Sequence, residues 1–306
     1  MSQKLAFTKA TKEQAKLRLA VFGPSGSGKT FTSLRVATGL SGKIAVIDTE
    51  RGSASKYADR FTFDVLELDD TDINTYCAAI SAAQVAGYPV LILDSLTHAW
   101  QELLGEIDKL ARSKYGGNTW AAWSEGTPKQ RGLVDAILNY DGHVIATMRS
   151  KTEWVTTTDG NGRSKPQRIG LAPQQGKGIE YEFDLLMELC VEHIGTVIKD
   201  RTGRFQDQTI KEPGEELGQQ LAAWLMEGEP PTPPEPFVMD IEMPTVSKWP
   251  ELHDAAVKQL GYNHAAHVKN TLTKIFNGSA GELTHEAAWA ELVKHQQAKH
   301  ADEVPA

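Results

Sequence analysis

Residues 23–30 read Gly-Pro-Ser-Gly-Ser-Gly-Lys-Thr, which fits the phosphate-binding pattern G-x-x-x-x-G-K-[ST]. The run before this loop, Leu17 to Phe22, is short, apolar and typical of a β-strand. The run after it, Phe31 to Leu40, has apolar residues at helical spacing. The order of strand, glycine loop and helix is the context that the pattern requires. This order favours a loop that binds a nucleoside triphosphate over a glycine-rich turn that binds nothing.

The residue types in this loop each have a physical task. Glycines let the backbone curl so that several N–H groups point at one phosphate, and the helix N-terminus adds partial positive charge. Lys29 is expected to reach the β- and γ-phosphates, and the Thr30 hydroxyl is expected to bind Mg²⁺. The predicted cofactors are ATP and Mg²⁺. The predicted nucleotide-binding residues are Gly23, Pro24, Ser25, Gly26, Ser27, Gly28, Lys29 and Thr30.

The bulk composition is that of an ordinary globular protein. The 306 residues are 40% hydrophobic and 24% charged, which is enough for one large domain and a small one. No apolar run is long enough for a membrane span, and the polar stretch Met1 to Lys16 lacks the apolar core of a secretory signal. Cys77 and Cys190 lie in apolar runs and are expected to be buried thiols. We therefore expect a cytoplasmic protein without membrane contact, in the host cytoplasm if a phage encodes it.

The acidic charge is unevenly distributed. The net charge is −8, of which residues 227–306 contribute −6 and residues 1–226 contribute −2. An acidic protein is a poor candidate for binding nucleic acid, but here the acidity is concentrated in the tail. The larger part of the chain is therefore free to present a basic face.

Strand-like apolar runs alternate with helical patterns in the first half of the chain. Strands are expected at residues 43–48, 63–68, 89–94 and 143–148, and helices at about 72–86, 96–113 and 129–140. This alternation predicts an α/β fold with a mostly parallel central sheet flanked by helices. After residue 151, the β-prone run Trp154 to Thr158 and the turn signal Asp159 to Gly162 predict an inserted β-hairpin.

Proline marks the domain boundary. Residues 227–246 hold six of the fourteen prolines and are predicted to form a stiff, acidic linker. The predicted division is a core domain at 1–226, the linker at 227–246 and a small helical module at 247–306. This module holds most of the histidines but no cysteine, so a surface for a protein partner is favoured over a metal site.

Two carboxylates follow predicted strands. Asp94 ends an apolar strand 64 residues after Thr30 and is expected to hold Mg²⁺ through water, although it could also cap the next helix. Glu50 ends the strand after the loop's helix and is the candidate general base. The alternative for Glu50 is an exposed loop carboxylate. Since parallel strands carry active sites at their carboxyl ends, both residues are on the expected edge of the sheet.

The combined motifs resemble the RecA-type ATPase core. They are the glycine loop, Ile-Asp-Thr-Glu at 47–50 and Leu-Ile-Leu-Asp-Ser at 91–95. The resemblance implies that residues 1–226 are a RecA-like P-loop NTPase domain and that Glu50 is the catalytic carboxylate. It also implies that Thr147, in the strand ending at Arg149, occupies the position of the family's γ-phosphate sensor. That residue is usually glutamine, and threonine is shorter.

Lys199-Asp200-Arg201 resembles the Lys-x-Arg element of RecA-like hexamers such as replicative helicases. The resemblance implies that Lys199 and Arg201 reach the γ-phosphate of a neighbouring subunit, where a cation stabilises transition-state charge. The alternative is a turn between two strands with exposed charges. The first interpretation requires the chain to assemble with itself.

A closer resemblance is to small bacteriophage ATPases linked to recombination and single-strand annealing. It rests on four stretches and covers about residues 15–226, without the tail. The stretches are Phe31 to Leu34, Asp48 to Ala54, Asp94 to Trp100 and Thr147 to Glu153. This resemblance implies single-stranded DNA as a partner and DNA recombination, repair or annealing as the process.

Two segments have the composition of a single-strand binding surface, in which cations track the backbone and a ring stacks on a base. Residues 149–178 carry six cations against two carboxylates. The candidates in this segment are Arg149, Lys151, Trp154, Arg163, Lys165, Arg168 and Lys177. Residues 112–131 are the second candidate, although Trp120 and Trp123 could instead share a buried helix face.

The leading hypothesis is therefore a Mg²⁺-dependent ATPase that self-assembles on single-stranded DNA. One alternative is a small-molecule P-loop kinase whose lid carries the arginines of residues 149–178. Another is an adaptor or loader that is switched by ATP with little hydrolysis. The sequence does not distinguish a ring from a filament, or annealing from strand exchange.

Overall fold

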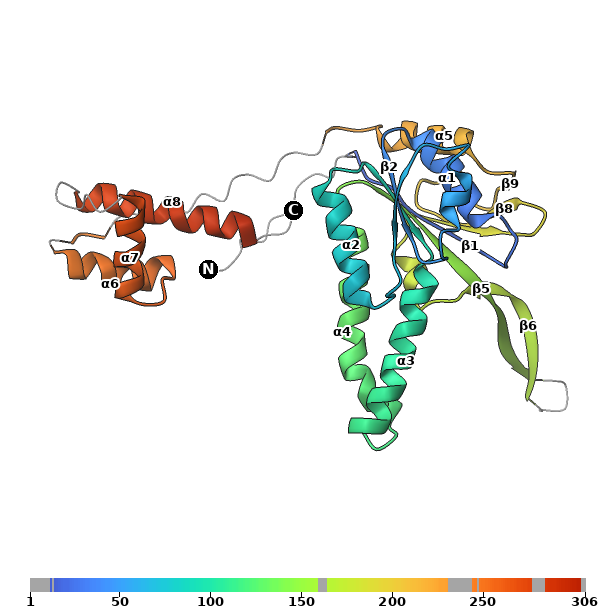
Figure 1. Cartoon of the computed structure of the whole chain (residues 1–306), viewed down its shortest axis with the longest axis horizontal. Coiled ribbons are helices and arrows are strands. Elements are labelled where there is room, and N and C mark those ends of the chain that lie inside the picture. The colour runs from blue at the N-terminus through green and yellow to red at the C-terminus, as the bar shows by residue number, and fades with distance from the viewer. Residues whose placement is uncertain are drawn as a thin grey trace. The chain divides into compact units, whose positions relative to one another are not determined.

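A computed structural model of the chain describes residues 12, 14–158, 164–230, 244–246, 248–276 and 284–303, with side chains at 153–169 and 297–303 left out. The chain divides into two compact units, Met1–Pro231 and Thr232–Ala306. The first unit is a three-layer α/β domain (Figure 1). The second unit contains the last three helices. No helix among the described residues is both long and apolar enough to cross a membrane.

The first unit is built on one large sheet. Its strands are β1 (Arg18–Gly23), β2 (Ile44–Asp48), β3 (Asp64–Glu67), β4 (Val90–Asp94), β5 (His143–Thr158), β6 (Ser164–Pro173), β7 (Leu185–Leu189), β8 (Ile194–Asp200) and β9 (Thr209–Lys211). The strand order is β3-β2-β4-β5-β1-β7-β8-β9, and β6 pairs only with β5. Neighbouring strands from β3 to β7 are parallel, whereas β8 and β9 are antiparallel additions. The predicted mostly parallel sheet is confirmed.

Helices cover both faces of this sheet. They are α1 (Lys29–Leu40), α2 (Ile73–Val85), α3 (Leu96–Lys114), α4 (Thr119–Leu138) and α5 (Glu215–Leu225), with short 3₁₀ turns η1 (Ala54–Tyr57) and η2 (Ile179–Tyr181). Side chains alternate along each strand, so Leu19 and Val21 pack with α1 and α5. Ala20 and Phe22 pack with α2, α3 and α4 on the other face. Because every residue of β1 is buried, the glycine loop that follows it starts from a rigid base.

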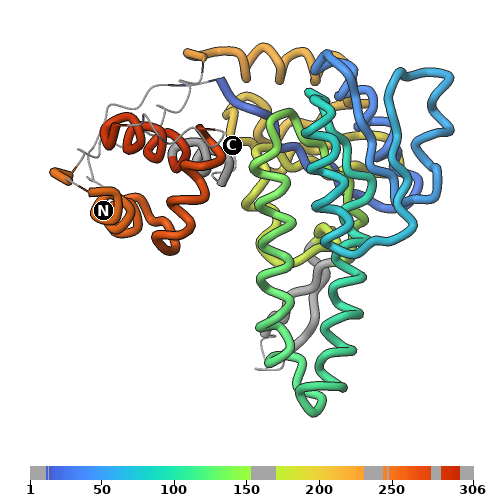
Figure 2. The backbone as a smooth tube through the Cα atoms, turned by 60° about the vertical axis from the view of Figure 1, so that its left-hand side comes forward, coloured from blue at the N-terminus to red at the C-terminus, as the bar shows by residue number. Residues whose placement is uncertain are grey.

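Helix α4 is longer than the sequence indicated. It begins at Thr119, ten residues before the expected start, and continues through Pro128. Gly126 allows α4 to pack closely against α3, because an added Cβ would lie 2.4 Å from the Ile107 side chain on α3. The two helices form a hairpin that projects from the sheet (Figure 2). Packing against α3 has thus overridden the local helix-breaking residues.

Strand β5 is also longer than expected, and it forms the inserted hairpin. Its first half lies in the central sheet, and its second half pairs antiparallel with β6 from Ser150↔Pro173 onward. The predicted β-hairpin is confirmed. The turn at Asp159–Gly162 lies outside the described residues.

A buried arginine fixes the edge of the sheet at which β1 and β5 begin. The Arg18 guanidinium donates hydrogen bonds of 2.6–3.1 Å to four carbonyl oxygens, those of Leu17, Leu138, Tyr140 and Gly142. These bonds join the start of β1 to the turn before β5. The two strands therefore enter the sheet in a fixed register, which sets where their carboxyl ends meet.

Acidification is expected to destabilise this edge through His143. The Leu17 N–H donates a 3.0 Å hydrogen bond to its Nδ1, and burial, followed by Lys16 and Arg18, lowers the His143 pKa from 6.5 to about 4. The unfolded chain therefore binds this proton at higher pH than the folded chain. The stability contribution is complete above pH 6.5 and is lost as the pH falls toward about 4, by about 3 kcal/mol.

Chemical unfolding at pH 7, 5.5 and 4.5 measures this loss. A His143→Gln variant keeps a hydrogen-bond acceptor but does not titrate, so its stability should fall less over the same range. Equal losses in the two proteins would assign the acid sensitivity to other groups.

The second unit is a small helical bundle. Its helices are α6 (Trp249–Leu260), α7 (Ala265–Ile275) and α8 (His285–Glu303). Their apolar faces meet around Leu252, Val268, Trp289 and Leu292.

Candidate functional site

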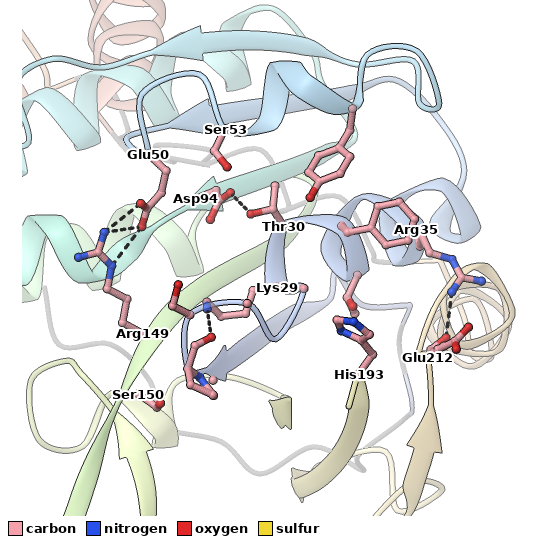
Figure 3. A pocket seen from close by; sticks show the side chains of 18 of the residues that line it. Lys29, Thr30, Arg35, Glu50, Ser53, Asp94, Arg149, Ser150, His193 and Glu212 are labelled. Carbon is pink, nitrogen blue, oxygen red and sulfur yellow. Dashed lines mark hydrogen bonds and ion pairs between the residues drawn. The ribbon is translucent and has the colours of Figure 1, made fainter. Parts of the chain in front are cut away.

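The glycine loop lies between β1 and α1, at the carboxyl edge of the parallel strands (Figure 3). Gly26 and Gly28 have φ angles of 80° and 86°, a region that side chains disfavour. An added Cβ on Gly23 would lie 2.2 Å from the Leu189 carbonyl oxygen. The first turn of α1 contains no acidic residue, so its positive end is free to attract an anion.

A cavity of about 890 Å³ opens at this loop. It brings together residues that are far apart in the sequence, because adjacent strands end level with one another. Asp48 lies opposite Asp94, and Gly23 lies opposite Arg149. The polar and charged residues that line it include Lys29, Thr30, Glu50, Asp94, Arg149 and His193. The structure thus joins the loop, Glu50 and Asp94 in one site, as their positions at strand ends indicated.

Lys29 lies inside the loop. Its Nζ donates a 2.8 Å hydrogen bond to the Pro24 carbonyl oxygen, and its side chain lines the cavity. Burial lowers the pKa of Lys29, while Asp94 and Glu50 act against this shift. A phosphate is a stronger partner for this ammonium group than a neutral carbonyl.

Asp94 is the centre of the expected magnesium site. It is 2% exposed, and its carboxylate accepts hydrogen bonds from Thr30 Oγ1 at 2.6 Å and Thr147 Oγ1 at 2.5 Å. Burial raises the pKa of Asp94, and these two hydroxyl bonds oppose the rise. Hydroxyl and carboxylate oxygens on one cavity wall are the ligand type that Mg²⁺ prefers, so these residues fit the ion.

Thr147 differs from its expected position. Instead of facing the cavity as a γ-phosphate sensor, its fully buried hydroxyl is bound to Asp94. The short threonine side chain is buried within the sheet. Thr147 therefore orients the carboxylate of Asp94.

Glu50 lines the cavity just beyond the end of β2. Asp48 shapes this turn, because its carboxylate accepts hydrogen bonds from the Glu50 N–H at 2.6 Å and the Ala54 N–H at 2.9 Å. The Glu50 carboxylate is held by Arg149, with nitrogen–oxygen distances of 2.9, 2.9 and 3.2 Å. This carboxylate thus faces the cavity while paired with a residue from β5.

A polar network that was not expected from the sequence lies beside Glu50. His98 Nε2 lies 3.7 Å from Glu50 Oε1, and His98 Nδ1 lies 2.7 Å from Thr49 Oγ1. The Tyr76 hydroxyl donates a 2.7 Å bond to the Ser95 carbonyl oxygen in the same network. Burial lowers the pKa of His98. The sequence feature that could have indicated this network is the position of His98 in the first turn of α3, four residues after Asp94.

Aromatic residues line another part of the cavity. The Phe31 ring lies 5.4 Å from those of both Tyr57 and Phe61, and the Arg60 guanidinium lies 5.9 Å from the Phe31 ring. Phe31, Tyr57 and Arg60 line the cavity. These flat apolar surfaces suit a nucleobase, and no motif in the sequence marks them as part of the site.

His193 closes the cavity beside the loop. It lies in the turn between β7 and β8, and its Nδ1 donates a 3.0 Å hydrogen bond to the Ser27 carbonyl oxygen. Through this bond the sheet supports the middle of the glycine loop.

Lys199 and Arg201 lie outside this cavity. Lys199 Nζ donates to the carbonyl oxygens of Glu180 and Tyr181 at 2.8 and 2.9 Å, and Arg201 pairs with Asp184 at 3.2 Å. Because β8 runs antiparallel to β7, these residues lie beside the start of β7, at the edge of the sheet opposite the glycine loop. They do not contribute to the site of their own chain.

The structure describes only some of the DNA-binding candidates. Arg149 points into the cavity, whereas Lys151 and Lys177 are exposed. Arg163 and the side chains of Trp154, Lys165 and Arg168 lie outside the described part.

In the second candidate segment, Lys114 pairs with Glu125, and Lys129 pairs with Glu106. Trp123 stacks on Trp100 at 5.6 Å. Trp120 is 87% exposed near the tip of the α3–α4 hairpin.

A glycine loop between a buried strand and a helix, facing a hydroxyl and a carboxylate on one cavity wall, defines a P-loop nucleotide-binding domain. Comparison with family models supports this class, since the model described as an AAA domain matches residues 15–210. The match spans more than half of the chain, which therefore belongs to this family of ATPase-type domains. A search of curated proteins found no match.

Proposed function

We propose that this chain is a Mg²⁺-dependent ATPase that assembles on single-stranded DNA and uses ATP to control its affinity for the DNA. The observation that carries the proposal is the path of β5. This strand carries Thr147, which bonds to Asp94, and Arg149, which lines the cavity, and it then continues into the projecting β5–β6 hairpin. The nucleotide site and the hairpin are thus connected by one strand.

The proposed hydrolysis follows from the cavity's residues. Lys29 and the loop N–H groups bind the phosphates, and Thr30 and Asp94 hold Mg²⁺. When bound, Mg²⁺ neutralises charge on the β- and γ-phosphate oxygens. Glu50 accepts a proton from the attacking water once its carboxylate is free. The aromatic surface of Phe31 and Tyr57 receives the base.

The DNA part of the proposal rests on charge and resemblance. Residues 149–178 have an excess of cations, and the exposed Lys151 and Lys177 are part of it. The stretches shared in pattern with phage recombination and annealing ATPases point to the same partner. Recombination, repair or annealing of phage DNA is the process we propose.

Steady-state ATP hydrolysis at low salt, with and without single-stranded DNA, tests the proposal. We expect the DNA to raise the rate at least about tenfold, and added salt to reduce this effect because phosphate contacts are screened. A rate that is indifferent to DNA would contradict the proposal. ADP formed without free phosphate, in the presence of small metabolites, would instead indicate a kinase.

Self-assembly gives a separate prediction. Because Arg201 lies outside its own cavity, we propose that it acts on the nucleotide of a neighbouring chain. Arg201→Ala and Lys29→Ala chains should each be inactive alone, and mixing them should restore part of the turnover. Without recovery at any mixing ratio, Arg201 would have no role in a neighbouring site.

A further inference from the structure

Two non-glycine residues on the wall of the nucleotide cavity have left-handed backbone conformations. His193, in the turn between β7 and β8, has a φ angle of 60°, and Glu212, directly after β9, has a φ angle of 49°. The Glu212 N–H donates a 2.8 Å hydrogen bond to the His193 carbonyl oxygen, so the two turns are joined. Both residues line the cavity. Strained residues of this kind cluster at ligand sites.

Arg35 fixes Glu212 beside the first turns of α1. Its Nη1 donates a 3.0 Å hydrogen bond to the Glu212 carbonyl oxygen, and its Nε lies 2.9 and 3.1 Å from the carboxylate oxygens of Glu215. Gly214 permits this approach, because an added Cβ would lie 2.4 Å from Arg35 Cζ. Arg35 is one helical turn after Phe31 and therefore lies on the same side of α1 as the aromatic surface.

The corner formed by His193 and Glu212 offers hydrogen-bond acceptors to the cavity. The Glu212 carboxylate is exposed, and none of the described residues donates a hydrogen bond to it. His193 Nδ1 carries the hydrogen that it donates to Ser27, so in the neutral ring Nε2 is an acceptor. The Arg35 guanidinium is already engaged by Glu215 and by the Glu212 carbonyl oxygen. This corner therefore favours a hydroxyl group over a phosphate.

The path of a bound nucleotide brings its ribose to this corner. The phosphates bind the glycine loop and the base lies on the aromatic surface, so the ribose lies between them, beside the start of α1. His193 flanks the loop, because an added Cβ on Gly28 would lie 3.1 Å from its Nδ1. Figure 3 shows His193 and Glu212 on the side of Lys29 away from Glu50, which is the nucleoside end of the cavity.

We propose that Glu212 determines sugar specificity, its carboxylate accepting hydrogen bonds from the ribose hydroxyls of the nucleotide, with His193 Nε2 as a second acceptor. This inference rests on the proposed function, to which it adds a preference for ribonucleotides over deoxyribonucleotides. A deoxyribose leaves a desolvated acceptor without a donor at this corner, and the nucleotide that carries it binds more weakly.

The test measures the binding of ATP, 2′-deoxy-ATP and 3′-deoxy-ATP by calorimetry, with Mg²⁺ and without DNA. The wild type should bind at least one of the deoxy analogues about tenfold more weakly than ATP, because a hydrogen bond to a charged acceptor is lost. Glu212→Ala should bind ATP and the analogues with equal affinity. Glu212→Gln keeps one acceptor oxygen, so its preference should lie between those of Glu212→Ala and the wild type.

Glu216→Ala is the matched control. Glu216 is an exposed carboxylate in the first turn of α5 and does not line the cavity. Its replacement should leave the preference for ATP unchanged. Because the measured quantity is a ratio of affinities for one protein, a general loss of structure in a variant would not imitate the expected result.

Three results would overturn the inference. One is equal affinity of the wild type for ATP and both deoxy analogues. Another is a loss of affinity in Glu212→Ala that is equal for all three nucleotides, as a structural role would give. Inosine triphosphate, which lacks the adenine amino group, provides the third. If Glu212→Ala removed a preference against this nucleotide and kept that against the deoxy analogues, Glu212 would read the base instead of the ribose.

These measurements need neither DNA nor hydrolysis, so the inference and the proposed function fail separately. A rate of ATP hydrolysis that is indifferent to DNA would contradict the proposed function and leave the sugar preference intact. Hydrolysis stimulated by DNA, with equal affinity for ATP and its deoxy analogues, would contradict the inference alone.

Discussion

Replacing Lys29 with alanine is expected to lower ATP turnover about a thousandfold. Lys29 Nζ bonds to a neutral carbonyl oxygen, whereas Arg35 and Arg149 in the same cavity are paired with carboxylates. Lys29 lies within the glycine loop and is available to a phosphate, so its loss leaves developing charge without compensation. Phosphate release measures the loss of turnover, and calorimetry measures the binding of ATP.

Lys43 provides the control for this prediction. It is exposed on the chain just before β2 and does not line the cavity. A Lys43→Ala variant should therefore retain normal turnover. If Lys29→Ala also retained it, the glycine loop would not be the site of hydrolysis.

Glu50→Gln is expected to reduce turnover by about 10²–10⁴-fold while ATP still binds. The amide has nearly the same shape but does not accept the proton of an attacking water. Because the glycine loop, Lys29 and Thr30 are unchanged, the affinity for ATP should stay within about threefold of the wild type. Single-turnover hydrolysis separates this effect from product release.

The matched control is Glu67→Gln, at the end of the neighbouring strand β3. Glu67 is opposite Asp48 in the sheet but does not line the cavity. Its replacement should leave turnover intact. Equal losses in the two variants would attribute the effect to general disturbance of this edge rather than to a base at Glu50.

The sequence was sufficient to predict the edge on which the site lies. Glu50 and Asp94 each follow an apolar run that is bounded by helical patterns. Parallel strands bring such residues together whatever their separation in the chain. The fold class and the inserted hairpin were predictable for the same reason, because they depend on short-range periodicity.

The interactions within the site were not predictable in this way. Arg149 and Glu50 are 99 residues apart, and only the register of β5 against β1 and β4 brings them together. Arg149 was instead assigned to a DNA surface from the excess of cations in residues 149–178 and from the resemblance, which places a DNA loop after this strand. The sensor position of Thr147 was inferred by resemblance, whereas its hydrogen bond to Asp94, 53 residues away, depends on the pairing of β4 with β5.

We propose that ATP controls how tightly this chain binds DNA, and the affinity for a labelled single strand tests this most directly. The Glu50→Gln protein, which should hold ATP without hydrolysing it, is titrated onto the strand with ATP and Mg²⁺, and again with ADP and Mg²⁺. The account predicts binding at least about tenfold tighter with ATP, a difference of about 1.4 kcal/mol. Equal affinity in the two nucleotide states, or no binding at low salt, would contradict it.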